Sequence, residues 1–195
     1  MSKLLTAGDL AFRFTSNRLC LDFLATIGEV GHRNIERIGS PQQYSSWISA
    51  ARLVDGEPLI GTPDVAEAIE FRRVLRAYFT QLKNGDVPEV SLVRAINAAA
   101  RRPPPRWELN DGGLDVSRRA DAAGAAALSS VARDVLMLVS EKLHLRVKHC
   151  QDPTCNMFFL DTSRGNNRIW CATEGRGCGN KAKKRAFRSR QRELL

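Results

Sequence analysis

The C-terminal fold is decided by residues 150–181, which read CQDPTCNMFFLDTSRGNNRIWCATEGRGCGNK. This stretch holds four of the chain's five cysteines, as a Cys-x4-Cys pair and a Cys-x6-Cys pair separated by fifteen residues. Two closely spaced pairs on either side of a loop can bring four thiolates to one tetrahedral zinc ion. We predict that one zinc ion is bound by Cys150, Cys155, Cys171 and Cys178. Four thiolates fill the coordination sphere, so the ion would be structural rather than catalytic.

Three other interpretations of the cysteines stay open at this point. Two disulfides would need an oxidising compartment, and nothing in the sequence indicates one. Four unrelated buried thiols would have to cluster by chance within 29 residues. An iron–sulfur cluster uses the same ligands, and His149 can stand in for Cys150 as a ligand. We favour zinc because of the paired spacing.

The residues around the cysteines predict a small module whose fold depends on the metal. We expect a strand over 157–160, a turn rich in Gly and Asn over 161–167, and a return strand over 168–170. A helix should then begin at Cys178 and run to about residue 192. This order of knuckle, hairpin and helix resembles a treble clef. The aromatic side chains expected to pack around the site are Phe158, Phe159, Trp170 and Phe187.

The same stretch resembles the CGNR zinc finger, which forms the C-terminal part of a family of bacterial, stress-induced transcription regulators. The matching residues are Cys150, Cys155, Phe158, Leu160, Asp161, Thr162, Ser163, Trp170, Cys171, Cys178, Gly179, Asn180, Ala182 and Lys183. Two features depart from the family pattern. Lys181 stands where the signature has Arg, which keeps the charge but loses the fork geometry. The second cysteine pair is two residues longer, so its Gly-Arg-Gly segment should bulge as a loop.

Charge is distributed unevenly along the 195 residues. The net charge is +9, and residues 142–195 carry 13 Lys and Arg against four acidic residues. The part before residue 142 holds 17 basic and 17 acidic residues and is formally neutral. This asymmetry predicts a body over 1–144 and a cationic contact module over 145–195. Because neither an apolar run of membrane-spanning length nor a signal peptide is evident, we expect a cytoplasmic protein without a membrane partner.

The first 144 residues predict an α+β body that is mostly helical. Apolar spacing and capping signals indicate helices over 19–27, 41–53, 62–84, 86–100 and 128–143. Alternating residues over 10–14 predict a short strand, followed by Asn17 as the cap of the first helix. A second alternating pattern over 107–116, interrupted by Asn-Asp-Gly-Gly, predicts a hairpin. No flexible linker precedes Cys150, so the finger should be held rigidly against the body.

A second resemblance lies near the N-terminus. Leu21-Asp22-Phe23 with Thr26 is similar to the Leu-Asp-Phe-x-Asn-Thr signature of the ABATE domain, which usually precedes the CGNR finger. Ala25 replaces the Asn, so any contact that this Asn makes in the family is missing here. Asp22 lies on an apolar helix face and needs a partner, so we favour a structural ion pair over a ligand-recognition site. The residues considered for either role are Asp22, Thr26, Arg72, Arg73 and Arg76.

The helix expected over 178–192 is rich in basic residues, and further arginines lie in the turns before it. Together they offer a cationic surface to a phosphate backbone, although a merely solvated helix is the alternative. We predict nucleic-acid contacts from Arg164, Arg168, Arg176, Asn180, Lys181, Lys183, Lys184, Arg185, Arg188, Arg190 and Arg192. Asn180 and Arg185 have the donors and acceptors needed to read base edges.

The resemblance implies a DNA-binding transcription regulator. Its finger would contact double-stranded DNA, and its body would respond to a small-molecule effector or a protein partner. Two other functions stay open, an RNA-binding module and a protein–protein adaptor whose finger docks on an acidic partner. Catalysis is not expected, because His32 is the only histidine before residue 144 and neither a nucleophile–base pair nor a Gly-rich phosphate loop is evident.

Overall fold

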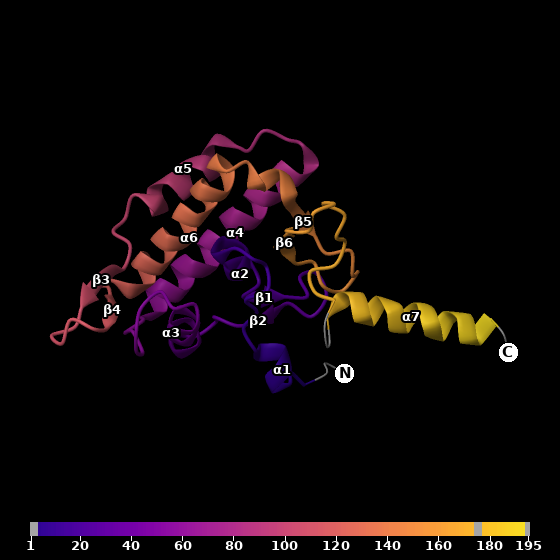
Figure 1. Cartoon of the computed structure of the whole chain (residues 1–195), viewed down its shortest axis with the longest axis horizontal. Helices are drawn as coiled ribbons and strands as arrows, with labels where there is room; N and C mark the ends of the chain where they lie inside the picture. Colours follow the sequence, from indigo (N-terminus) through magenta and orange to yellow (C-terminus); the bar gives the residue numbers. More distant parts are fainter. Residues whose placement is uncertain (1–3, 174–176, 194–195) are drawn as a thin grey trace.

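A computed structural model describes residues 4–173 and 177–193, apart from the side chains of residues 192 and 193. Its elements in chain order are α1 (Ala7–Leu10), α2 (Leu19–Leu24), β1 (Ile27–Gly28), β2 (Ile35–Glu36), α3 (Pro41–Ala50), α4 (Thr62–Asn84), α5 (Val90–Ala100), β3 (Arg106–Leu109), β4 (Val116–Arg119), α6 (Ala123–Ser140), the 3-10 helix η1 (Leu143–Arg146), β5 (Val147–His149), β6 (Phe158–Leu160) and α7 (Cys178–Glu193). Long helices combined with short strands confirm the predicted α+β class. Figure 1 shows α4, α5 and α6 side by side in the body, with α7 extending away from it.

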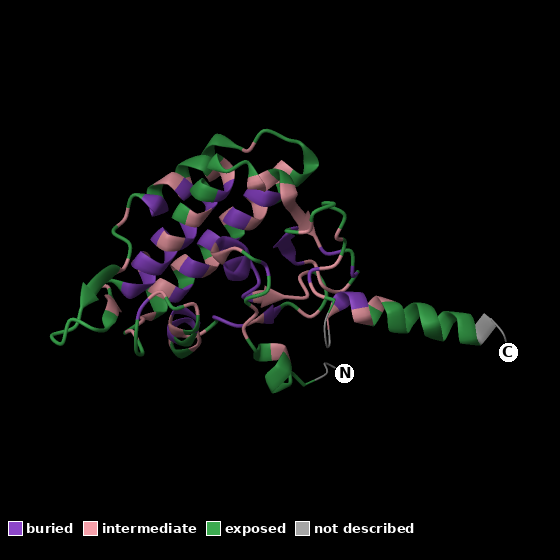
Figure 2. Cartoon of the chain, viewed as in Figure 1, coloured by how far each residue is buried: buried purple, intermediate pink, exposed green. Residues whose placement is uncertain are grey.

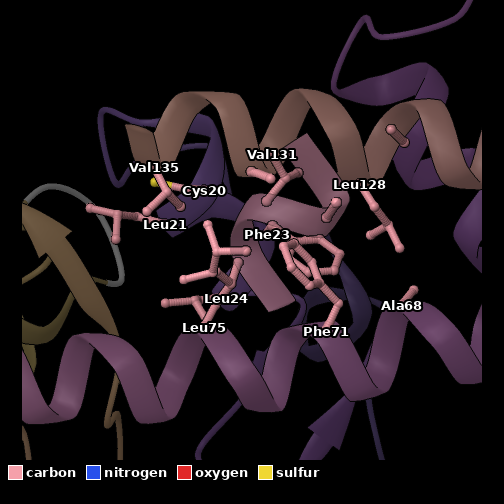
Figure 3. Packing of buried hydrophobic residues seen from close by; sticks show 14 of the residues in the cluster. Cys20, Leu21, Phe23, Leu24, Ala68, Phe71, Leu75, Leu128, Val131 and Val135 are labelled. Atoms are coloured by element: carbon pink, nitrogen blue, oxygen red, sulfur yellow. The ribbon is translucent and has the colours of Figure 1, made fainter. Parts of the chain in front are cut away.

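The body's core forms where the short helix α2 lies between α4 and α6 (Figure 3). Its side chains Leu21, Phe23 and Leu24 are at most 1% exposed. In Figure 3, Phe23 lies beside Phe71 of α4, and Leu24 lies beside Leu75. Burying one such side chain stabilises the folded state by roughly 1.5–3 kcal/mol. The apolar side chains whose spacing predicted α2 therefore fill much of the space between α4 and α6.

Helix α6 meets the length and hydropathy expected of a membrane span. However, 56% of this span is buried within the protein, where α6 packs against α2, α4 and α5. Asp134, within the span, accepts hydrogen bonds from the Arg18 guanidinium at 2.9 Å and from the Cys20 N–H at 2.9 Å. These contacts make α6 the central helix of the core.

Local signals predicted several helix ends correctly. The Ser40 hydroxyl caps α3 by accepting a backbone N–H, and Gly85 ends α4 in the left-handed conformation at φ 83°. Two predicted helix starts are wrong. Helix α5 begins only at Val90, because the Val-Pro step before it disfavours helical geometry. Asn17 adopts a left-handed φ of 65°, and its side chain donates to the Leu160 carbonyl instead of capping α2.

The described strands form three antiparallel pairs. Pairing of β3 with β4 confirms the predicted hairpin. The strand expected over 10–14 is wrong, because helix α1 occupies its start and the rest pairs with no described strand. The return strand expected over 168–170 is also wrong. Strand β6 pairs instead with β5, which lies just before the turn that carries Cys150 and Cys155.

Strand β6 joins the finger to the body, because neighbouring side chains of a strand point to opposite faces. Phe158 and Leu160 belong to the body's core, whereas Phe159 belongs to a separate cluster that contains the four metal-site cysteines and partly buried neighbours. The Phe158 ring lies 6.0 Å from the ring of Phe79 in α4, measured between centroids. The finger therefore shares a core with the body, as the short connection predicted.

Candidate metal centre and cationic helix

The four predicted cysteines converge at one point. Cys150 follows β5, Cys155 lies in the turn before β6, Cys171 ends the next long loop, and Cys178 is the first residue of α7. Their Sγ atoms all lie within 4.8 Å of one another. Cys155 is half-buried and the other three are buried. The fold therefore places four thiols from two loops and one helix at one point.

The distances between these sulfurs fit a metal centre. The Cys155 and Cys171 Sγ atoms lie 3.6 Å apart, and those of Cys171 and Cys178 lie 3.7 Å apart. A tetrahedral zinc site with Zn–S bonds of about 2.3 Å has sulfurs about 3.8 Å apart, whereas a disulfide needs about 2.05 Å. All four cysteines are free. The four cysteines are thus positioned to coordinate one metal ion, consistent with a single structural zinc. His149 is not part of the cluster, and its ring packs 5.0 Å from that of Phe158.

Two charged residues hold the loop between β6 and Cys171. Asp161 is fully buried and accepts hydrogen bonds from Lys148 Nζ at 2.8 Å, Ser163 N at 2.9 Å and Arg168 N at 2.8 Å. Burial opposes ionisation of this carboxyl, but the three donors outweigh it and hold the pKa of Asp161 well below its usual range. The carboxylate therefore remains charged and organises the loop.

Arg168 is predicted to contact nucleic acid, yet its guanidinium is engaged inside the finger. Its Nε donates to the Trp170 carbonyl at 2.9 Å, and its Nη2 donates to the Cys171 carbonyl. Its Cζ lies 5.0 Å from the centroid of the Phe159 ring. Arg168 therefore holds the backbone of a cysteine in place. Arg164, in the same loop, is exposed.

Helix α7 is also fixed to the finger by an ion pair between a buried carboxylate and a half-exposed arginine. Asp152 lies between the first two cysteines, is 2% exposed and accepts from Arg185 Nη2 at 3.0 Å. Thr154 donates to the same carboxylate through its N–H at 3.0 Å and its hydroxyl at 2.8 Å. Burial raises the pKa of Asp152, but these hydrogen bonds outweigh it, so the net shift is downward. Arg185 therefore helps to position α7 through this contact with Asp152.

Gly179 is a second feature of this attachment. A Cβ atom at this position would lie 2.9 Å from Thr173 Cγ2 and 3.2 Å from Trp170 Cδ1. Both distances are shorter than ordinary contacts, so glycine lets the first turn of α7 press against the loop.

Beyond its first turn, α7 is surrounded by solvent (Figure 2). Every residue from 183 to 191 is exposed, including Phe187 at 57%. The prediction that Phe187 packs around the metal site is wrong, since its side chain lies in solvent and belongs to neither buried cluster. Asn180 is half-buried. The exposed cations on the helix are Lys181, Lys183, Lys184, Arg185, Arg188 and Arg190. Arg176 and the side chain of Arg192 lie outside the described residues.

The predicted ion pair between Asp22 and an arginine is wrong. Asp22 is 9% exposed, and its carboxylate accepts from Ser16 N at 2.9 Å. Burial raises its pKa to about 6, and the nearby Asp134 adds to this rise. Asp22 is therefore an acid that folding makes harder to ionise.

The three arginines of the same prediction serve other contacts. Arg72 is buried and donates to Thr26 Oγ1 at 2.7 Å and to both carboxylate oxygens of Glu36. Arg76 donates from both Nη atoms to the Asn156 carbonyl, at 3.3 and 3.2 Å, and so ties α4 to the metal knuckle. Arg73 is exposed and pairs with its neighbour Glu70 at 3.0 Å. Thr26, Arg72 and Arg76 thus join separate segments of the fold, whereas Arg73 contacts only its own helix.

Two known families match this chain. Residues 17–142 match the ABATE family, described as "putative stress-induced transcription regulator". Residues 146–191 match the CGNR zinc finger, and this segment holds all four clustered cysteines and most of α7. Neither description names an enzyme. No curated protein matches the sequence.

Proposed function

The chain belongs to the ABATE family and ends in a CGNR zinc finger, and from this premise we propose that it binds double-stranded DNA through α7. The body over residues 1–144 would carry the regulatory input, from a small molecule or a protein partner, and the finger over residues 145–195 would carry the DNA contact.

The observation that carries this proposal is the exposure of α7. A helix packed on its own protein buries one face, but α7 buries none beyond its first turn. Helix α7 contains seven Lys and Arg against one acidic residue, Glu193, and only Arg185 pairs with a carboxylate of the described residues, so the helix presents a strong excess of positive charge. Isolated helices of this length are marginally stable in water. A partner that accepts the helix and neutralises its charge would stabilise it.

DNA has both properties. The major groove is about 12 Å wide and admits an α-helix, and phosphates line its edges. At about 1.5 Å per residue, the 16 residues of α7 span roughly 24 Å. Lys181, Lys184 and Arg188 lie on one side of the helix at spacings of three and four residues. Since Arg185 on that side also pairs with Asp152, the metal knuckle would set the angle at which this side meets DNA.

The metal's part in this proposal is structural. Cys150, Cys155, Cys171 and Cys178 would hold a zinc ion, which fixes the first residue of α7 to both loops and leaves no open coordination position. Arg168 and Arg185 support that arrangement and would act on DNA indirectly. The direct contacts would come from Arg164 and from the other exposed cations of α7, which are Lys181, Lys183, Lys184, Arg188 and Arg190.

Fluorescence anisotropy of the zinc-loaded protein with labelled duplex DNA tests the proposal. Six or more phosphate contacts predict that the logarithm of affinity falls with the logarithm of salt concentration at a slope of about −5. RNA of matching sequence is the comparison. Tighter binding to RNA would replace DNA by RNA as the ligand, and no binding to either at low salt would favour a protein-docking role for the finger.

A further inference from the structure

A small hollow lies where the body meets the finger. It has a volume of about 330 Å³ including its mouth, and its walls come from the N-terminal segment, β1, the residue after β2, the metal knuckle and the start of α7. The residues that matter for its chemistry are Arg13, Gly28, Glu29, Arg37 and Lys181. Three of these five carry positive charge, and one carries negative charge.

Arg37 is the unusual member of this set. It is only 2% exposed, yet it makes no ion pair with any carboxylate of the described residues. Its Nε donates to the Asp9 carbonyl at 2.9 Å, and its Nη1 donates to the Ala25 carbonyl at 3.0 Å. Burial, followed by repulsion from Arg13, lowers the pKa of Arg37 to about 10, so the group stays charged at neutral pH. The Asp9, Glu29 and Glu36 carboxylates attract it through space, but each of them pairs with another arginine, Arg33 or Arg72, so this buried guanidinium has no anion of its own among the described residues.

Gly28 gives the guanidinium its place. A Cβ atom at residue 28 would lie 2.6 Å from both Nη atoms of Arg37. Any larger residue would push the charged group away from the backbone of β1. The glycine therefore holds the Arg37 guanidinium flat at the wall of the hollow, where its remaining Nη2 donor has no partner among the described residues.

The other charges of the hollow leave it positive. Arg13 is half-buried and Lys181 is exposed, and neither side chain forms a hydrogen bond or ion pair with a described residue, although Lys181 attracts the Glu29 carboxylate through space. The acid in the wall, Glu29, is occupied by Arg33, whose Nε lies 2.7 Å from one carboxylate oxygen and whose Nη2 lies 3.0 Å from the other. Three cations thus face a space that holds no uncommitted acid of the described chain.

We propose that this hollow binds a single oxyanion of the phosphate class, held by Arg37 with Arg13 and Lys181. Charge-assisted hydrogen bonds to a phosphate match the planar fork of arginine and the point charge of lysine. The hollow is too small for an extended ligand and suits one phosphate group. Because the cations come from the body and from α7, the bound anion would tie the two parts together. The phosphate site depends on the proposed DNA binding only if the phosphate that it holds is part of DNA.

The metal offers a competing account of the same charges. Zinc with four thiolates carries a net charge of about −2, and Cys155 and Cys178 also line the hollow. If the cations only balance that charge, replacing them should weaken metal binding and leave phosphate without effect.

The test uses the full-length zinc-loaded protein with inorganic phosphate as the probe. Its thermal midpoint is measured in phosphate and in chloride at equal ionic strength, for wild type, Arg13→Gln, Lys181→Gln and the control Arg94→Gln, an exposed arginine on α5. We expect phosphate to raise the midpoint of wild type and of Arg94→Gln. Each hollow variant should bind phosphate about tenfold more weakly with its zinc content unchanged.

Either of two results would overturn the site. One is that phosphate acts no differently from chloride on the wild type, and the other is that the two hollow variants lose zinc without any change in phosphate affinity. Arg37→Gln is left out, because replacing a buried arginine can unfold the protein, and lost phosphate binding would then not report on the site.

A DNA arm separates the two sources of phosphate. If inorganic phosphate at constant ionic strength displaces duplex DNA, and Arg13→Gln weakens DNA binding, then a DNA phosphate occupies the hollow. If phosphate binds but DNA affinity is unchanged, the ligand is a free phosphate-bearing molecule. Failure of the proposed function would leave phosphate binding intact, whereas failure of the site would leave DNA binding by α7 intact.

Discussion

The body and α7 are held in place by different physical means. The body has a neutral sequence and buries the apolar faces of α2, α4 and α6 against one another. Helix α7 buries nothing beyond its first turn and is fixed by a thiol, a glycine contact and the Arg185–Asp152 ion pair. The body therefore has its own source of stability, whereas the position of α7 depends on the metal centre. The predictions below test this division, beginning with the largest effect.

Removing one ligand should separate the two parts most clearly. Cys171→Ser should reduce the zinc content from about one ion per chain to nearly none, because three thiolates hold zinc far less tightly than four. Amide hydrogen exchange should then show protection lost over residues 150–185 and retained in α4 and α6. The control is Cys20→Ser, which changes the fifth cysteine, buried in the body. Its zinc content should equal that of wild type. Retained zinc in Cys171→Ser, or full protection without metal, would contradict the division.

Phe158→Ala should weaken both parts together. This side chain is 2% exposed and packs against Phe79, although it belongs to a strand of the finger. The cavity left behind should reduce the free energy of unfolding by about 3–5 kcal/mol, as urea denaturation would measure. Phe187→Ala, the matched change on the exposed helix, should alter stability by less than about 0.5 kcal/mol. Equal losses for the two variants would mean that α7 packs on the body.

Asp22→Asn should sharpen the description of the body's core. The folded state holds the Asp22 proton up to about pH 6, whereas the unfolded chain releases it near pH 4. Folded protein therefore binds more protons between these values, so wild-type stability should fall as pH rises from 4 to 6 and then stay level. The asparagine variant lacks this penalty.

The variant should consequently exceed wild type by up to about 3 kcal/mol at pH 7.5 and match it at pH 4. Denaturation midpoints at the two pH values measure this, with Asp111→Asn, an exposed acid in the hairpin turn, as the control. A stability gain that is the same at both pH values would show that Asp22 is not an ionised buried acid.

What the sequence predicted correctly was set by short-range patterns. The spacing within each cysteine pair, the Ser-Pro start of α3 and the turn between β3 and β4 are each set by a few neighbouring residues, and each prediction was confirmed by the geometry. Gly85, which ends α4, was also predicted correctly from its immediate neighbours.

What the sequence could not predict depends on the tertiary fold. Strand β6 had two possible partners at similar separations along the chain, β5 before it and residues 168–170 after it, and the sequence pattern favoured the wrong one. Arg72, Arg168 and Arg185 each donate to a carboxylate or a carbonyl that the tertiary fold places beside them. The sequence does not show these acceptors, so Arg168 and Arg185 were predicted to be free for nucleic acid. Phe187 was expected inside only because aromatic residues usually are. Helix α7 extends away from the body, so no core lies beside Phe187.

The central claim is that α7, and not the general positive charge of the chain, contacts DNA. Its most direct test is the salt dependence of duplex binding for two zinc-loaded variants with equal charge loss. One replaces Lys183, Lys184, Arg188 and Arg190 by Ala and leaves the Arg185–Asp152 pair intact. The other replaces four exposed cations of α4, α5 and the turn after α5: Arg73, Lys83, Arg94 and Arg101. We predict that the first variant alone loses affinity, with a salt slope shallower by about three to four. Equal losses in both variants, or no loss in the first, would contradict the claim.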